Sequence, residues 1–88
     1  MDIIPIPGSD DALELAATAD GYGYIASIAR TRPDGSAAWI AFPPLGPVQD
    51  AWITVRLEGQ RLTASSWSAF DVQIDLSTGH QIGRIFTK

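Results

Sequence analysis

The sequence Phe-Asp-Val-Gln-Ile-Asp-Leu at residues 70–76 alternates apolar and polar side chains without a break. A period of two places the apolar side chains on one face of a β-strand and the polar ones on the other. The next residues, Ser77-Thr78-Gly79, predict a turn that ends in a left-handed glycine. The return strand should cover residues 80–87, with a bulge near Gly83, because its apolar side chains change face there.

The run just upstream has the same period. Residues 51–57, Ala-Trp-Ile-Thr-Val-Arg-Leu, alternate in the same way and lead into Glu58-Gly59, which predicts a tight two-residue turn. That turn would set Val55 opposite Leu62 in a hairpin. Together these runs predict a continuous antiparallel meander over residues 51–88.

The first half of the chain also contains strand and turn signals. Residues 22–30 are rich in aromatic and branched side chains and end near Arg32-Pro33-Asp34-Gly35, a turn sequence, after which residues 39–42 form a short strand. Residues 11–19 fit either a strand or a short Ala-rich helix. The expected Asp20-Gly21 turn, which leads straight into the next strand, favours the strand.

These elements predict an all-β fold: a small antiparallel meander of about six to seven strands, forming a two-sheet sandwich or a partly open barrel. We expect residues 1–88 to be one domain. Residues 1–10 would be an arm or edge segment, and residues 12–42 a first sheet. Residues 43–50, rich in proline, would be an extended surface connection to a second sheet at residues 51–88.

The order of strands and turns in residues 51–88 resembles one four-stranded blade of the quinoprotein β-propeller repeats. That family carries an Asp, two variable residues, Thr and Gly at a turn, which corresponds here to residues 75–79. The last strand lacks the usual tryptophan of the family. The resemblance implies the local geometry of a blade and no quinone-binding or catalytic residue, since a propeller needs about 4 to 8 blades.

Composition excludes several classes of function. The 88 residues include no cysteine and a single histidine, so we predict neither a metal site nor a cofactor. The net charge is −4 and the six basic residues are scattered, which disfavours nucleic acid as a partner. No apolar run approaches the roughly 20 residues of a membrane-spanning helix. The first residues do not resemble an export signal, so we expect a cytoplasmic protein that does not bind membranes.

His80 is the one candidate for acid–base catalysis. A small hydrolase could use it with Asp75 or Asp71, but the serines do not lie in a strained nucleophile turn. Asp71 and Asp75 would lie about 13 Å apart on one strand, too far for a pair of glycosidase carboxylates. A solvated turn histidine, with Asp75 capping the turn, is the simpler interpretation, and we assign no catalytic residue.

The aromatic residues are the candidates for binding. Trp39 lies in an apolar run and is expected in the core, whereas the alternation puts Trp52 on the polar face, diagonal to Trp67. Two large rings on a polar face can bind a sugar ring or a partner protein, and Tyr22 and Tyr24 could extend the patch. Alternatively, the proline-rich connection or the arm covers both rings and buries them.

The leading functional hypothesis is a non-enzymatic binding or protein-interaction module that uses Trp52 and Trp67. One version is an acidic inhibitor or immunity protein that covers a basic partner. The alternatives are the small hydrolase and a homo-oligomeric assembly subunit. A homodimer is expected because the edge strand at residues 80–87 has few charges to discourage pairing with a second copy.

Overall fold

The computed structural model describes residues 2–19, 21–46 and 48–87, and in these residues it contains strands and no helix. The strands are β1 (Asp2–Pro5), β2 (Ala12–Ala17), β3 (Ile25–Thr31), β4 (Ala37–Ala41), β5 (Trp52–Glu58), β6 (Arg61–Ser66), β7 (Phe70–Ile74) and β8 (Gln81–Phe86). The predicted all-β antiparallel fold is confirmed. Eight strands are described, because the amino-terminal segment forms a strand of its own. No helix in these ranges is long and apolar enough to cross a membrane.

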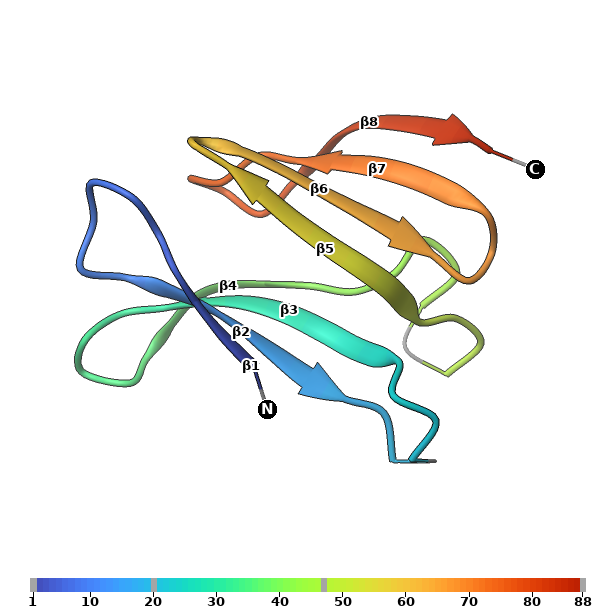
Figure 1. Cartoon of the computed structure of the whole chain (residues 1–88), viewed down its shortest axis with the longest axis horizontal. Helices are drawn as coiled ribbons and strands as arrows, with labels where there is room; N and C mark the ends of the chain where they lie inside the picture. Colours follow the sequence, from blue (N-terminus) through green and yellow to red (C-terminus); the bar gives the residue numbers. More distant parts are fainter. Residues whose placement is uncertain (1, 20, 47, 88) are drawn as a thin grey trace.

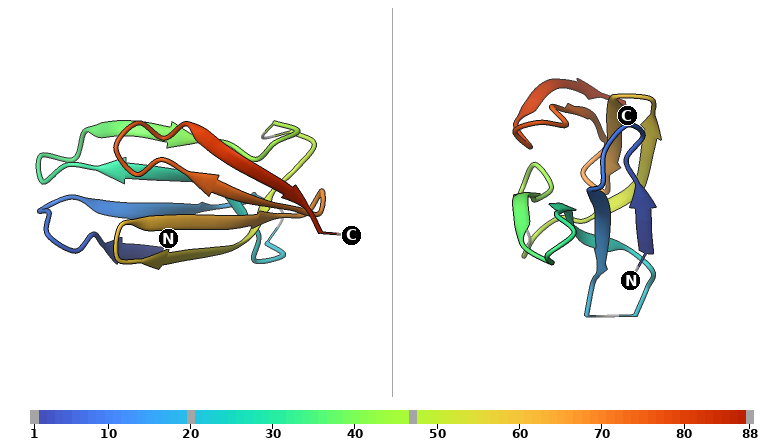
Figure 2. Two further views of the ribbon diagram at one scale, coloured as in Figure 1. Left: turned by 90° about the horizontal axis from the view of Figure 1, so that it is seen from above. Right: turned by 90° about the vertical axis from the view of Figure 1, so that its left-hand side faces the viewer.

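One continuous antiparallel sheet contains all eight strands, in the order β1-β2-β3-β5-β6-β7-β8, with β4 also paired to β3. The strand β3 joins the two halves: it pairs with β4 along Ile28 to Thr31 and with β5 only where Ile25 meets Trp52. Figure 1 shows β5–β8 stacked over β1–β4, and the end-on view of Figure 2 shows the same two layers. The sheet is therefore folded over on itself and mostly open, which agrees with the predicted partly open barrel.

The core lies between the two halves of the sheet. The first half contributes Leu13 and Ile28, and the second half contributes Leu62, Val72 and Ile74. Each of these side chains is fully buried or nearly so, and burial of one such side chain stabilises a fold by roughly 1.5–3 kcal/mol. Residues 11–19 include β2, so the preference for a strand over a helix is correct. The Asp20-Gly21 turn includes Asp20, which lies outside the described residues.

The hairpin between β5 and β6 is present, but its predicted register is wrong. Leu57, rather than Val55, pairs with Leu62, and the turn consists of Gly59 and Gln60, one residue later than expected. Gly59 has φ of 60°, the left-handed conformation that glycine adopts at little cost. The glycine therefore occupies the first position of the turn and not the second.

A bulge in β5 also reverses the predicted face of Trp52. The register shifts between Trp52 and Thr54, which leaves Ile53 as an extra, exposed residue. Trp52 consequently points to the same side as the core residues of β6 and is fully buried. Its Nε1 donates a hydrogen bond to the carbonyl oxygen of Ala41 at 3.3 Å. Trp52 is a core residue and does not belong to an exposed aromatic face.

The strands β7 and β8 follow the prediction closely. Asp75 Oδ1 accepts hydrogen bonds from the backbone N–H groups of Ser77 and Thr78, and so caps the turn before β8. Gly79 ends this turn with φ of 78°. The predicted bulge is present: Ile82, next to Gly83, is the extra residue in the pairing of β8 with β7.

The amino-terminal segment and one end of the sheet close against each other. The strand β1 pairs with β2, and Ile6, just after β1, is buried. Arg30 Nε forms a 2.8 Å ion pair with Asp11 Oδ2, and its Nη1 donates to the carbonyl oxygen of Leu76 at 3.0 Å. Trp39 Nε1 donates to the same carbonyl oxygen at 2.8 Å. We call this the closed end.

Candidate functional site

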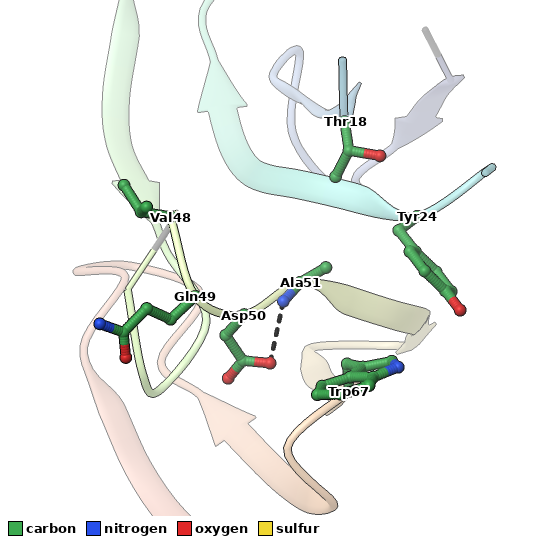
Figure 3. Close-up of a pocket in the computed structure, with 7 residues that line it drawn as sticks. All are labelled: Thr18, Tyr24, Val48, Gln49, Asp50, Ala51 and Trp67. Atoms are coloured by element: carbon green, nitrogen blue, oxygen red, sulfur yellow. Dashed lines mark hydrogen bonds between the residues drawn. The ribbon is translucent and has the colours of Figure 1, made fainter. Parts of the chain in front are cut away.

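The opposite end of the sheet holds an open, shallow pocket of about 210 Å³ (Figure 3). It lies where β2, β5 and β6 reach the end that is away from Arg30. Residues from three separate segments line it: Thr18, Tyr24, Val48, Gln49, Asp50, Ala51 and Trp67. In Figure 3, Trp67 and Tyr24 lie on one side of the pocket and Val48 and Gln49 on the other, with Asp50 and Ala51 between them. We call this the open end.

The turn between β6 and β7 presents Trp67 to solvent. Its backbone N–H donates to the carbonyl oxygen of Ala51 at 2.8 Å, and the N–H of Ala69 donates to the carbonyl oxygen of Ser66. Ala69 has φ of 72°, which is unfavourable for a residue with a Cβ atom. The backbone of Trp67 is therefore held firmly, while 62% of the residue is exposed.

Asp50 forms the base of the pocket and is only 7% exposed. Its Oδ1 accepts hydrogen bonds from the backbone N–H groups of Ala51 and Ser68, at 2.9 and 3.1 Å. Its Oδ2 accepts from the N–H of Leu45 at 3.2 Å and from the hydroxyl of Ser68 at 2.6 Å. Within the described residues, all four hydrogen-bond partners of this carboxyl group are donors, so its two oxygens act only as acceptors.

The proline-rich connection, residues 43–50, is folded and not extended as predicted. Gly46 N–H donates to the carbonyl oxygen of Pro43, and Asp50 N–H donates to that of Gly46, so the chain turns back twice before β5. Pro47 lies outside the described residues. These turns bring Val48, Gln49 and Asp50 to the same place as Trp67, and Ser68 then joins the two segments through Asp50.

The predicted binding residues occupy three different environments. Trp67 and Tyr24 line the pocket together, as a binding surface requires. Tyr22 is 78% exposed, and its ring centroid is 6.5 Å from that of Tyr24, so it extends the aromatic surface beyond the pocket. Trp52 lies in the core. Asp50 and Gln49 were not predicted as site residues. The signal for Asp50 is its place after a proline-rich turn, where the Asp side chain often bonds to nearby backbone.

Within the described residues, the side chain of His80 forms no hydrogen bond or ion pair with a serine or a carboxylate. His80 is exposed in the turn before β8, where its N–H donates to Thr78 Oγ1 and its carbonyl oxygen accepts from the N–H of Asp75. Asp71, the other proposed partner, accepts a 2.6 Å hydrogen bond from Ser65 Oγ. Within the described part of the chain, no group of three or more acidic or histidine side chains is placed to hold a metal ion.

Comparisons of the chain with protein-family models, curated proteins and solved structures gave no match. The site is therefore interpreted from its own geometry.

Proposed function

We propose that the chain is a non-enzymatic binding module that recognises a partner protein through the open end. The observation that carries this proposal is Trp67, a large ring that is mostly exposed on a turn with a fixed backbone. Exposed aromatic rings over a well-ordered base are typical of the residues that dominate binding energy at protein interfaces. An exposed ring contributes little to the fold itself, so the binding role accounts for its position.

The size and chemistry of the pocket favour a side chain of a protein over a separate small ligand. Its volume of about 210 Å³ lies below the range of roughly 300–1,000 Å³ that is typical of small-molecule sites. The acceptor positions of Asp50 are already taken by four protein donors, so this carboxylate has little capacity left to accept from sugar hydroxyl groups. A single side chain from a partner surface fits this space better than a sugar does.

A photoreactive amino acid, incorporated at position 48 or, as a control, at position 58, tests the proposal. Val48 is 95% exposed at the rim of the pocket, whereas Glu58 is exposed at the far end of β5. We expect crosslinking from position 48 in lysate of the source cell to trap a discrete partner, and Trp67→Ala to remove that product. The same products from positions 48 and 58, a product that survives Trp67→Ala, or no product at position 48 would each contradict the proposal.

A second candidate, a homo-oligomeric assembly subunit, is favoured by β8. This strand ends the sheet and pairs with β7 alone among the described strands, and it exposes Ile82, Ile85 and Phe86. Its one charged residue, Arg84, lies over the ring of Phe70 at 5.2 Å and donates to Gln81. A charge that is engaged in this way does little to prevent another β8 from pairing with the edge. A homodimer with antiparallel β8 strands is the form we propose.

Sedimentation equilibrium decides the assembly proposal. Ile85→Lys should turn the dimer into a monomer, because a lysine on the edge must be desolvated when two strands pair. Ile3→Lys, on exposed β1 at the other end of the strand order, is the matched control and should leave the dimer intact. A wild-type chain that stays monomeric at its highest soluble concentration would contradict the proposal.

Two expectations from the sequence remain hypotheses. The resemblance of residues 51–88 to a propeller blade is a hypothesis about local geometry, from which we take no functional residue. A cytoplasmic location is likewise proposed, and cell fractionation tests it.

A further inference from the structure

The described residues that line the pocket at the open end and a second hollow beside it carry a single kind of charge. Of the residues that line the pocket, Asp50 is the one with a formal charge. Tyr24 also lines a second hollow of about 240 Å³, in which Asp2 is the one charged residue. Neither hollow is lined by arginine or lysine from the described residues, and the whole chain carries a net charge of −4. A cation approaching this end meets only attractive formal charges in the lining.

Among the described residues, no cation forms an ion pair with Asp50. In the described residues the ion pairs are Arg30 with Asp11 and Arg56 with Glu58, and neither includes Asp50. Its hydrogen bonds come from backbone N–H groups and a hydroxyl group, which are neutral. They hold the carboxylate in place but leave its net negative charge at the base of the pocket, where low exposure to water strengthens its attraction for a cation.

The aromatic rings add a second attraction for the same kind of group. Trp67 and Tyr24 lie on one side of the pocket (Figure 3), and the face of an aromatic ring attracts a cation. Arginine suits such a site especially well, because its flat guanidinium stacks on a ring while its N–H groups donate hydrogen bonds at the edge.

The closed end shows how this chain combines the same residue types. There Arg30 lies opposite Trp39 in the pairing of β3 with β4, and its guanidinium forms an ion pair with Asp11. Arg30 and Trp39 both donate to the carbonyl oxygen of Leu76. The pocket at the open end has the tryptophan and the aspartate but no arginine in its lining. The missing member is the cation.

We propose that the pocket at the open end binds the guanidinium group of an arginine side chain on the partner protein. This inference rests on the proposed binding function and specifies its ligand. The guanidinium stacks on Trp67 and faces the negative charge of Asp50. The overall negative charge of the chain accelerates association with a basic partner.

Nuclear magnetic resonance titration of the whole ¹⁵N-labelled chain tests the ligand. The probes are the capped peptide Gly-Arg-Gly, its neutral citrulline analogue of nearly the same shape, the corresponding lysine peptide, and a methyl glucoside. We expect the arginine peptide to shift the backbone signals of Gln49 and Trp67 and to bind roughly fivefold to tenfold more tightly than the citrulline peptide. Raising the salt concentration should reduce this preference, because it screens the charges.

Variants identify the groups responsible. Trp67→Ala should abolish the shifts, and Asp50→Asn should remove most of the preference for arginine over citrulline. Asp50→Asn also perturbs the hydrogen bonds of the connection, so the salt dependence of the wild-type chain provides the same test without a substitution. Equal binding of citrulline, stronger binding of the lysine peptide or the glucoside, or no shift with any probe would overturn the arginine proposal. The crosslinking from position 48 decides the binding function separately.

Discussion

Each end of the folded sheet has a tryptophan and an aspartate, but the two ends use them differently. At the closed end, Trp39 is buried and Asp11 is paired with Arg30. At the open end, Trp67 is mostly exposed, and Asp50 is held by neutral donors only. The comparison indicates that the closed end stabilises the fold, and it is the basis of our proposal that the open end binds a partner. Substitutions that remove the same kind of group at each end should separate these roles.

The largest difference is expected among the tryptophans. Trp39→Ala should lower the free energy of unfolding by about 3–5 kcal/mol, because it leaves a large cavity in the core and removes the hydrogen bond to Leu76. Trp67→Ala should lower it by less than about 1 kcal/mol, since most of that residue is already in water. Urea denaturation measures both. Similar losses for the two variants would show that Trp67 belongs to the core.

The cost of replacing a glycine by alanine should also differ between the two ends, at Gly79 and at Gly46. Both glycines have positive φ, but a Cβ atom at Gly79 would lie 2.6 Å from the ring of Trp39, while one at Gly46 would meet nothing within 4 Å. Gly79→Ala should therefore cost about 3 kcal/mol, and Gly46→Ala about 1 kcal/mol from backbone strain alone. Equal costs in thermal or urea unfolding would mean that the turn is not packed against Trp39.

The ion pair at the closed end should matter more than an exposed one. Arg30→Met removes the ion pair with Asp11 and a hydrogen bond to Leu76, in a partly buried place, and should cost about 2 kcal/mol. Arg56→Met removes a pair with Glu58 that is 3.7 Å long and exposed, and should cost below about 0.5 kcal/mol. If the two variants unfold at the same urea concentration, Arg30 does not close this end.

The smallest effect is expected at the turn that presents Trp67. Ala69→Gly should stabilise the chain by about 0.5–1 kcal/mol, because glycine adopts the positive φ of this position without strain. Ala37→Gly, in β4, is the control and should destabilise by a similar amount, since strand residues gain nothing from glycine. A loss of stability in Ala69→Gly would show that the turn is not strained.

The sequence predicted those parts of the fold that depend on neighbouring residues. The strand β7 and the turn at residues 75–79 follow from alternation and turn chemistry, and both were predicted. The predicted face of Trp52 was wrong because the bulge at Ile53 cannot be recognised in the local alternation of apolar and polar residues. A bulge depends on how the whole of β5 pairs with β6 and on what the core must bury.

The candidate site was predicted only in part, for a related reason. Alternation placed Trp67 on a polar face, and Tyr22 and Tyr24 flank Gly23, so these three residues were predicted to bind together with Trp52. The pocket itself forms because Thr18, the connection before β5 and the turn after β6 meet at one end of the sheet. Asp50 joins the last two through Ser68, which is 18 residues away in the sequence. Such a contact forms only when the sheet is folded, so a local sequence pattern cannot predict it.

The solvent exchange of the three indole N–H groups tests the central claim most directly, namely that one end is closed and the other open. After transfer to deuterated water, the signals of Trp39 and Trp52 should persist, because both indoles are buried and bonded to backbone carbonyl oxygens. The signal of Trp67 should disappear at once. In ordinary water, where all three signals are visible, it should be the one that shifts when the arginine peptide is added. A protected Trp67 indole, or a Trp39 indole that exchanges as fast as that of Trp67, would contradict the account.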